Sequence, residues 1–158
     1  MVVHIVIHII YKMKIVVQRV KRASVTVANE ITGSIEHGLL LLVGITTNDT
    51  AEEMRWMCEK ILKMRIFEDD DGKMNRSVSD VNGGILVVSQ FTLYGDARKG
   101  NRPSFIEAAR PEKAEPMYEE MVQYFKEHSP LNIQTGIFGA MMDVELVNDG
   151  PVTLILEK

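Results

Sequence analysis

Two short polar segments are the places where this sequence could do chemistry. The first, Ser89-Gln90-Phe91-Thr92-Leu93, places two hydroxyls and an amide directly after an apolar run. The second is Asn148-Asp149-Gly150-Pro151-Val152-Thr153. Each also has a purely structural interpretation, because strands often end in solvated polar residues and the second segment has the composition of a turn. From composition and spacing alone, both interpretations remain open.

The common catalytic signatures are absent from the sequence. It contains no GxSxG elbow, P-loop, HExxH motif, Cys/His quartet or dinucleotide-binding glycine pattern. The four histidines are scattered, so a His-driven triad is not predicted. Cys58 falls on the apolar stripe of a predicted helix, which favours a buried structural thiol over a nucleophile. The acidic run ending at Gly72 lacks the spacing of a calcium loop and predicts a hairpin tip. We expect neither a metal nor a cofactor.

Composition restricts the class of protein further. The chain has 158 residues, of which 46% are hydrophobic and 25% charged, as in an ordinary globular domain. A single cysteine excludes a disulfide framework. The net charge of −4 argues against binding nucleic acid over the whole surface. The apolar start is too short to span a membrane and lacks the features of a signal peptide. A cytoplasmic protein with no membrane partner is therefore expected.

Hydrophobic periodicity predicts the elements that position the two segments. Strands are expected over residues 14–20, 24–27, 31–35, 38–45, 85–93, 141–147 and 152–156. Helices are expected over residues 51–65, where Thr50 and Glu53 form a capping box, and 113–128, where Pro116 would fall in the first turn. This pattern predicts an α/β fold with mostly antiparallel or mixed sheets. Residues 13–158 are expected to form the domain, and residues 1–12 an extension outside it.

Four stretches of the sequence resemble those of one enzyme family. The SQFTL stretch (89–93) resembles a motif of the D-aminoacyl-tRNA deacylases, and residues 148–153 are similar to their NxGPVT motif. Residues 14–20 are similar to that family's first strand, and residues 100–105 to its central loop. The resemblance implies a homodimer whose subunits have a barrel-like core and two main helices. It also implies hydrolysis of D-aminoacyl-tRNA to free amino acid and tRNA, and glycyl-tRNA is expected to be accepted too, because glycine has no side chain to exclude.

The resemblance also assigns catalytic roles to the first segment. It implies that main-chain amides of Gln90 and Phe91 stabilise the oxyanion, with help from the 2′-hydroxyl of the substrate. Thr92 remains open as a direct nucleophile, although no base to activate it is visible in the sequence. Ser89 would contact the substrate.

The second segment would act across the dimer. The resemblance implies that Gly150-Pro151 is a cis peptide inserted into the pocket of the neighbouring subunit. Its carbonyl groups could there hold the ammonium group of the substrate and leave no room for an L side chain. Arg19 would support this motif. A cis bond is plausible only before proline.

Two other classes of function remain as alternatives. A non-catalytic nucleic-acid-binding module could share the fold, although it would need a larger basic face than this sequence shows. A general esterase would be expected to show a recognisable nucleophile and base. If the partner is the 3′ end of a tRNA, two clusters of basic residues could meet its phosphates. They are Arg98, Lys99 and Arg102, or Lys21 and Arg22.

Overall fold

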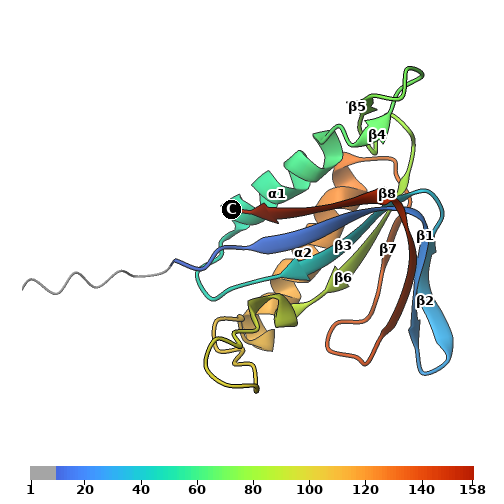
Figure 1. Cartoon of the computed structure of the whole chain (residues 1–158). Coiled ribbons are helices and arrows are strands. Elements are labelled where there is room, and N and C mark those ends of the chain that lie inside the picture. Colours follow the sequence, from blue (N-terminus) through green and yellow to red (C-terminus); the bar gives the residue numbers. More distant parts are fainter. Residues whose placement is uncertain (1–9) are drawn as a thin grey trace, which may run out of the picture.

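The computed structural model describes residues 10–158, which form one strongly curved sheet, a small hairpin and two α-helices (Figure 1). The strands are β1 (Lys14–Val27), β2 (Glu30–Ile35), β3 (Gly38–Gly44), β4 (Phe67–Glu68), β5 (Met74–Arg76), β6 (Gly84–Ser89), β7 (Ile133–Thr135) and β8 (Asp143–Glu157). The helices are α1 (Ala51–Lys63), α2 (Pro111–His128) and a short 3-10 helix, η1 (Phe91–Tyr94). Most of the predicted extension, residues 1–9, lies outside the described residues, and the boundary at Met13 stays a prediction.

The long strand β1 organises the sheet by changing its neighbours along its length. Residues 14–20 pair with β3, residues 23–27 pair with β2, and β8 runs beside both stretches. The sequence predicted two strands here, and that division was wrong because β8 keeps β1 extended across the change of partner. Beyond β3 the ladder becomes parallel, in the order β3, β6, β7.

The last strand, β8, is also continuous where two strands were predicted. It pairs with β1 on both sides of residues 149–152, so the chain does not reverse there. The register instead shifts around Val20, leaving Arg19 opposite this irregular stretch. The segment 148–153 is therefore an interruption inside a strand rather than a hairpin turn.

A close approach of β2 to β7 nearly closes the sheet into a barrel. A Cβ on Gly33 would lie 2.4 Å from the carbonyl oxygen of Thr135, so only glycine allows this contact. The two helices pack together against one side of the sheet (Figure 1). The mixed α/β, barrel-like fold predicted from the sequence is confirmed.

The helices form close to where the sequence predicts them. Both halves of the capping box are present, with the Glu53 carboxylate accepting from the Thr50 N–H. Cys58 is fully buried against the sheet, and burial raises the pKa of its thiol to about 12, as expected of a structural cysteine. The second helix starts two residues before its predicted start, with Pro111 at its first position, where proline is tolerated. Pro116 consequently lies inside the helix rather than in its first turn, which corrects the prediction.

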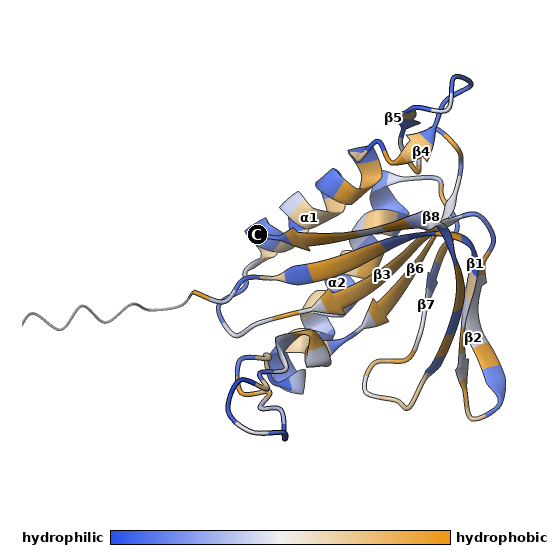
Figure 2. Cartoon of the chain, in the orientation of Figure 1, coloured by the Kyte–Doolittle hydropathy of each residue, from blue (hydrophilic) through white to orange (hydrophobic). Residues whose placement is uncertain are grey.

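Figure 2 shows the hydrophobic strands β3 and β6 at the centre of the sheet, whereas both helices carry hydrophilic residues on their outer faces. Every side chain of β6 before Ser89 is buried. No helix within residues 10–158 is long and apolar enough to cross a membrane.

Candidate active site

The first polar segment lies where β6 ends and η1 begins. The Gln90 N–H donates to the carbonyl oxygen of Val43 at 2.8 Å and so completes the parallel ladder with β3. The backbone then turns into η1, and the predicted continuation of the strand to Leu93 was wrong. The first N–H groups of a helix have no partner within it. No hydrogen bond from the Phe91 or Thr92 N–H to another of residues 10–158 is present.

Two backbone donors are therefore available side by side, and they differ in part from the expected pair. Of the two expected donors, Phe91 keeps a free N–H within residues 10–158, whereas the N–H of Gln90 is already paired. The side-chain amide of Gln90 donates to the hydroxyl oxygen of Thr92. Both side chains border the surface, and Thr92 is exposed. Within residues 10–158 no histidine or carboxylate forms a hydrogen bond with the Thr92 hydroxyl.

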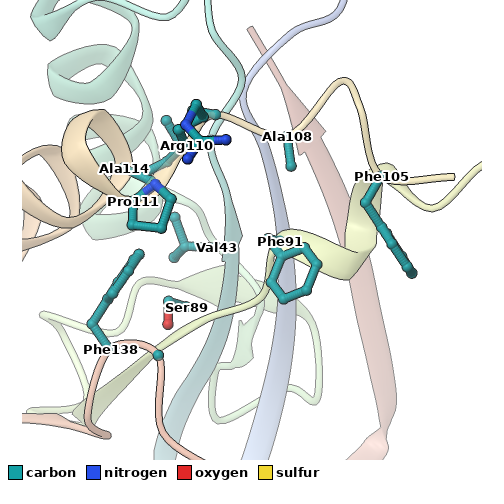
Figure 3. A pocket seen from close by; sticks show the side chains of 12 residues that line it. Val43, Ser89, Phe91, Phe105, Ala108, Arg110, Pro111, Ala114 and Phe138 are labelled. Carbon is teal, nitrogen blue, oxygen red and sulfur yellow. The ribbon is translucent and has the colours of Figure 1, made fainter.

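An apolar cavity of about 360 Å³ adjoins this strand end (Figure 3). Ser89 and Phe91 lie on one side of it, and the start of α2 on another. The Phe91 ring meets Phe105 edge to face, with ring centroids 5.3 Å apart. Phe138 and the backbone of Gly139 form a further wall. Apolar and aromatic walls with a few polar groups are typical of a pocket for a small planar ligand.

A buried carboxylate supports one wall of this cavity from behind. Asp49 is 5% exposed and accepts the Thr46 N–H at 2.7 Å. Thr46 in turn pairs with Ala108, which lines the cavity. Burial raises the pKa of Asp49 from 3.8 to about 6, against the opposing effect of its hydrogen bonds with the Thr46 and Met13 backbone. This carboxylate therefore positions the wall rather than facing the cavity.

The second polar segment forms a different site, around Arg19. This arginine is 4% exposed, and its Nη1 donates to the carbonyl oxygen of Ile66 at 2.7 Å. Its Nε lies 3.3 Å from Oδ2 of Asp149, an ion pair whose geometry is too poorly aligned for a hydrogen bond. The same carboxylate oxygen lies 4.0 Å from Nε2 of His37.

The Arg19 guanidinium also lies against Gly150. A Cβ on Gly150 would be 3.0 Å from Arg19 Nη2, and the glycine φ is +117°. The Gly150-Pro151 peptide is cis, and both residues are exposed. The guanidinium thus lies against an exposed, glycine-dependent stretch of backbone, and the supporting role expected of Arg19 stays a prediction.

The two segments are far apart within one chain. Arg19 of β1 and Ile85 of β6 both pair with the same residue of β3, Leu39. Ser89 lies four residues beyond Ile85 along β6, and so about 13 Å from it. Three strand spacings, about 14 Å, separate β8 from β6. Gly150 and Ser89 of the same chain are consequently roughly 20 Å apart.

Sequence reasoning did not identify several residues that shape these sites. Phe105 and Phe138 line the cavity, and Asp49 and His37 support the two sites. Phe105 was part of the similar central loop and could have been inferred from it. The other three come from segments without a motif, and only the fold brings them to these positions. Among residues 10–158 no group of three or more His, Cys, Asp or Glu residues could hold a metal ion.

The fold and the first site together define a class of protein, a small mixed α/β enzyme with backbone donors beside an apolar cavity. Comparison with known proteins makes this specific. Residues 16–157 match the family described as D-Tyr-tRNA(Tyr) deacylase. The chain belongs to this family.

Its relatives match it over nearly their whole length. The D-aminoacyl-tRNA deacylase of Chloroherpeton thalassium is 62% identical over 92% of this chain and 96% of the relative. That of Halalkalibacterium halodurans is 61% identical over 92% of this chain and 99% of the relative.

Two solved structures share the fold. One, named c-Myc DNA Unwinding Element Binding Protein, is 46% identical with a TM-score of 0.87, over 92% of this chain and 98% of that one. The other, named as a probable eukaryotic D-amino acid tRNA deacylase, has a TM-score of 0.77 over 93% of this chain and 100% of that one. At 16% identity the second likeness concerns the fold alone.

Proposed function

We propose that this protein hydrolyses the ester bond between a D-amino acid and the 3′ end of tRNA, in the cytoplasm, as a proofreading step in translation. The pair of free N–H groups at the start of η1, beside an apolar cavity, is the observation that carries the proposal. Family membership supports the same reaction. The ester is already activated, so the enzyme needs to orient the attack and stabilise an oxyanion rather than supply a strong nucleophile.

The cavity is suited to the base of the terminal nucleotide. Its volume of about 360 Å³ and its aromatic walls, Phe91, Phe105 and Phe138, fit a flat purine ring. A base held there would place its ribose near Ser89 and the free N–H of Phe91. The scissile carbonyl would then lie beside the oxyanion donors, and the 2′-hydroxyl of the ribose would assist the reaction.

Thr92 is the alternative nucleophile, and the main-chain route is better supported. The hydroxyl oxygen of Thr92 accepts a hydrogen bond from the Gln90 side chain, an amide that cannot remove a proton. Thr92→Ala should therefore retain activity. A substrate whose terminal ribose lacks the 2′-hydroxyl should be cleaved poorly. A dead Thr92→Ala together with full turnover of the deoxy substrate would restore the nucleophile hypothesis.

The protein is proposed to act as a homodimer with composite sites. Gly150 and Ser89 of one chain are too far apart to contact one amino acid. Two subunits related by a two-fold axis could bring the Gly150-Pro151 segment of one to the cavity of the other. The exposed backbone of this segment supports such insertion.

Chiral selection would then depend on a rigid backbone. D- and L-amino acids carry the same groups, so attraction alone separates them poorly, whereas steric exclusion separates them well. Carbonyl oxygens of Gly150 and Pro151 would hold the ammonium group and leave no space for an L side chain. Glycine has no side chain to exclude, so glycyl-tRNA should also be cleaved.

One assay tests the proposal against its rivals. The purified protein is incubated with D- and L-tyrosyl-tRNA, and release of free tyrosine is followed. Selective release of D-tyrosine is expected. Release of both isomers would indicate a general esterase. Binding without hydrolysis would favour a nucleic-acid-binding module, the function to which the name of one 46% identical structure points.

A further inference from the structure

A basic loop borders the cavity, and two of its three cations form no ion pair within residues 10–158. Its base is closed by two backbone hydrogen bonds between Asp96 and Ser104, of 2.8 and 2.9 Å. The residues between them project beyond the end of the sheet as a hydrophilic loop (Figure 2). Residues 96–104 contain one acidic and three basic side chains, so the loop has a net charge of +2 on a chain of net charge −4.

The three cations of this loop are not equivalent. Arg98 forms a two-pronged ion pair with Asp96, at 2.6 and 2.8 Å, and this pair lowers the pKa of Asp96 to about 2. Arg98 therefore braces the base of the loop. Lys99 and Arg102 are exposed and form no hydrogen bond or ion pair with any of residues 10–158. Gly100, with φ +80° and open space around it, turns the backbone between them.

The position of the loop relates these two cations to the cavity. Phe105 follows the base of the loop directly, lines the cavity and contacts the Phe91 ring. A nucleotide chain whose terminal base enters the cavity must continue outward past its rim. Its next phosphates would then pass a loop that carries two cations with no ion pair to any of residues 10–158.

The other basic pair, Lys21 and Arg22, has a different electrostatic environment. Arg22 lines a depression together with Glu36 and Glu145, whose carboxylates oppose attraction of phosphate. Ile15 is the residue of β1 that pairs with Val43, and Val43 pairs with Ser89 at the edge of the cavity. Lys21 and Arg22 lie far from Ile15 along β1, and so far from the cavity. The surroundings therefore favour the basic residues of the loop over Lys21 and Arg22 as the cations that meet the phosphates of tRNA.

We propose that Lys99 and Arg102 form the phosphate-binding site for the single-stranded 3′ end of tRNA, adjoining the base-binding cavity. This inference rests on the proposed function and extends it to the way in which the nucleic acid is held. Such contacts position the ligand without reading its sequence. Because bound phosphates release counterions, the contribution of these two cations must weaken as salt concentration rises.

The test compares two double variants of equal charge, Lys99→Gln/Arg102→Gln and Lys21→Gln/Arg22→Gln. The Kd for uncharged tRNA is measured between 50 and 200 mM salt, on the order of the range over which phosphate contacts respond. Loss of two single-strand contacts should lower the slope of log Kd against log salt by about 1.4 for the loop variant. The matched control should keep the wild-type slope. With D-tyrosyl-tRNA, the loop variant should raise KM and leave kcat unchanged.

The outcomes distinguish this site from the reaction itself. An unchanged slope in the loop variant, or an equal decrease in the control, would overturn the phosphate site. A wild-type protein that does not bind uncharged tRNA in a salt-dependent way would also overturn it. A wild-type protein that binds tRNA and does not release D-tyrosine would refute the proposed reaction and leave the binding site standing.

Discussion

Asp49 makes the stability of the protein depend on pH in a defined direction. Its pKa is about 6 in the fold against an ordinary 3.8, so the folded protein holds the proton more tightly than the unfolded chain. Its contribution to stability is fully present below about pH 4 and is lost as the pH rises through 6. Asp49→Asn removes this titration and keeps an oxygen to accept the Thr46 N–H.

The free energies of unfolding of the wild type and of Asp49→Asn, measured in urea at several pH values, should therefore diverge as the pH rises. Near pH 4 they should be equally stable. Above pH 7 the Asp49→Asn variant should be more stable by about 2–3 kcal/mol. A difference that does not change between pH 4 and 7 would contradict the raised pKa of Asp49.

Gly150 should be intolerant of any side chain. A methyl group there would meet Arg19 Nη2 and Val152 Cγ2 at 3.0 Å, at a φ of +117° that L-residues rarely adopt. Strain of about 1–3 kcal/mol would displace the segment. We expect Gly150→Ala to lower kcat/KM for D-tyrosyl-tRNA by roughly 10- to 100-fold.

Gly72→Ala is the matched control. Gly72, at the tip between β4 and β5, has a positive φ (+76°) as Gly150 does, but it has open space where Gly150 is crowded. This control should leave kcat/KM unchanged. Equal losses in both variants would mean that Gly150 affects the fold rather than the site.

Phe91 is the first residue of η1, a position at which its backbone N–H can be removed by substitution. Proline lacks an N–H and is accepted at the first position of a helix. Phe91→Pro therefore removes the proposed oxyanion donor together with the ring, whereas Phe91→Ala removes the ring alone. Loss of one oxyanion donor typically lowers kcat by about 10²–10³.

Under single-turnover conditions with saturating D-tyrosyl-tRNA, Phe91→Pro should be slower than Phe91→Ala by about that factor. Both variants should bind uncharged tRNA equally well. If their rates are the same, the Phe91 N–H does not stabilise the transition state.

The elements were predictable from sequence where local rules decide them. The capping box at Thr50 and the apolar spacing fix α1, and continuous apolar residues fix β3 and most of β6. The failures occurred where tertiary pairing decides. Residues 148–151 have the composition of a turn, yet pairing of β8 with β1 on both sides keeps the chain extended.

The candidate site shows the same division. Its motifs could be found in the sequence, because SQFTL and NxGPVT are local patterns. The pairing of the Gln90 N–H with Val43 and the supporting role of Asp49 depend on strands distant in sequence. No local pattern contains that information.

For the whole molecule, β8 presents the surface expected to bury on dimer formation. Ile155 is 65% and Leu154 36% exposed, and within residues 10–158 β8 pairs along one side only, with β1. An exposed apolar edge strand favours association. Ile155→Lys should shift the protein from dimer to monomer in sedimentation velocity and should lower activity with it.

Ile106→Lys is the control for that substitution, because Ile106 is 83% exposed and lies outside the strands. It should remain dimeric and active. A wild-type protein that is monomeric at the concentrations of the activity assay, and fully active, would exclude the proposed dimer.

Each active site is expected to take Phe91 from one subunit and Gly150 from the other. The most direct test mixes Gly150→Ala and Phe91→Pro chains in equal amounts, after unfolding and refolding them together. Each mixed dimer would contain one site with both native residues and one with neither. If subunits pair at random, deacylation of D-tyrosyl-tRNA should recover to about a quarter of the wild-type rate. Recovery no greater than the mean of the two separate variants would contradict a site shared between subunits.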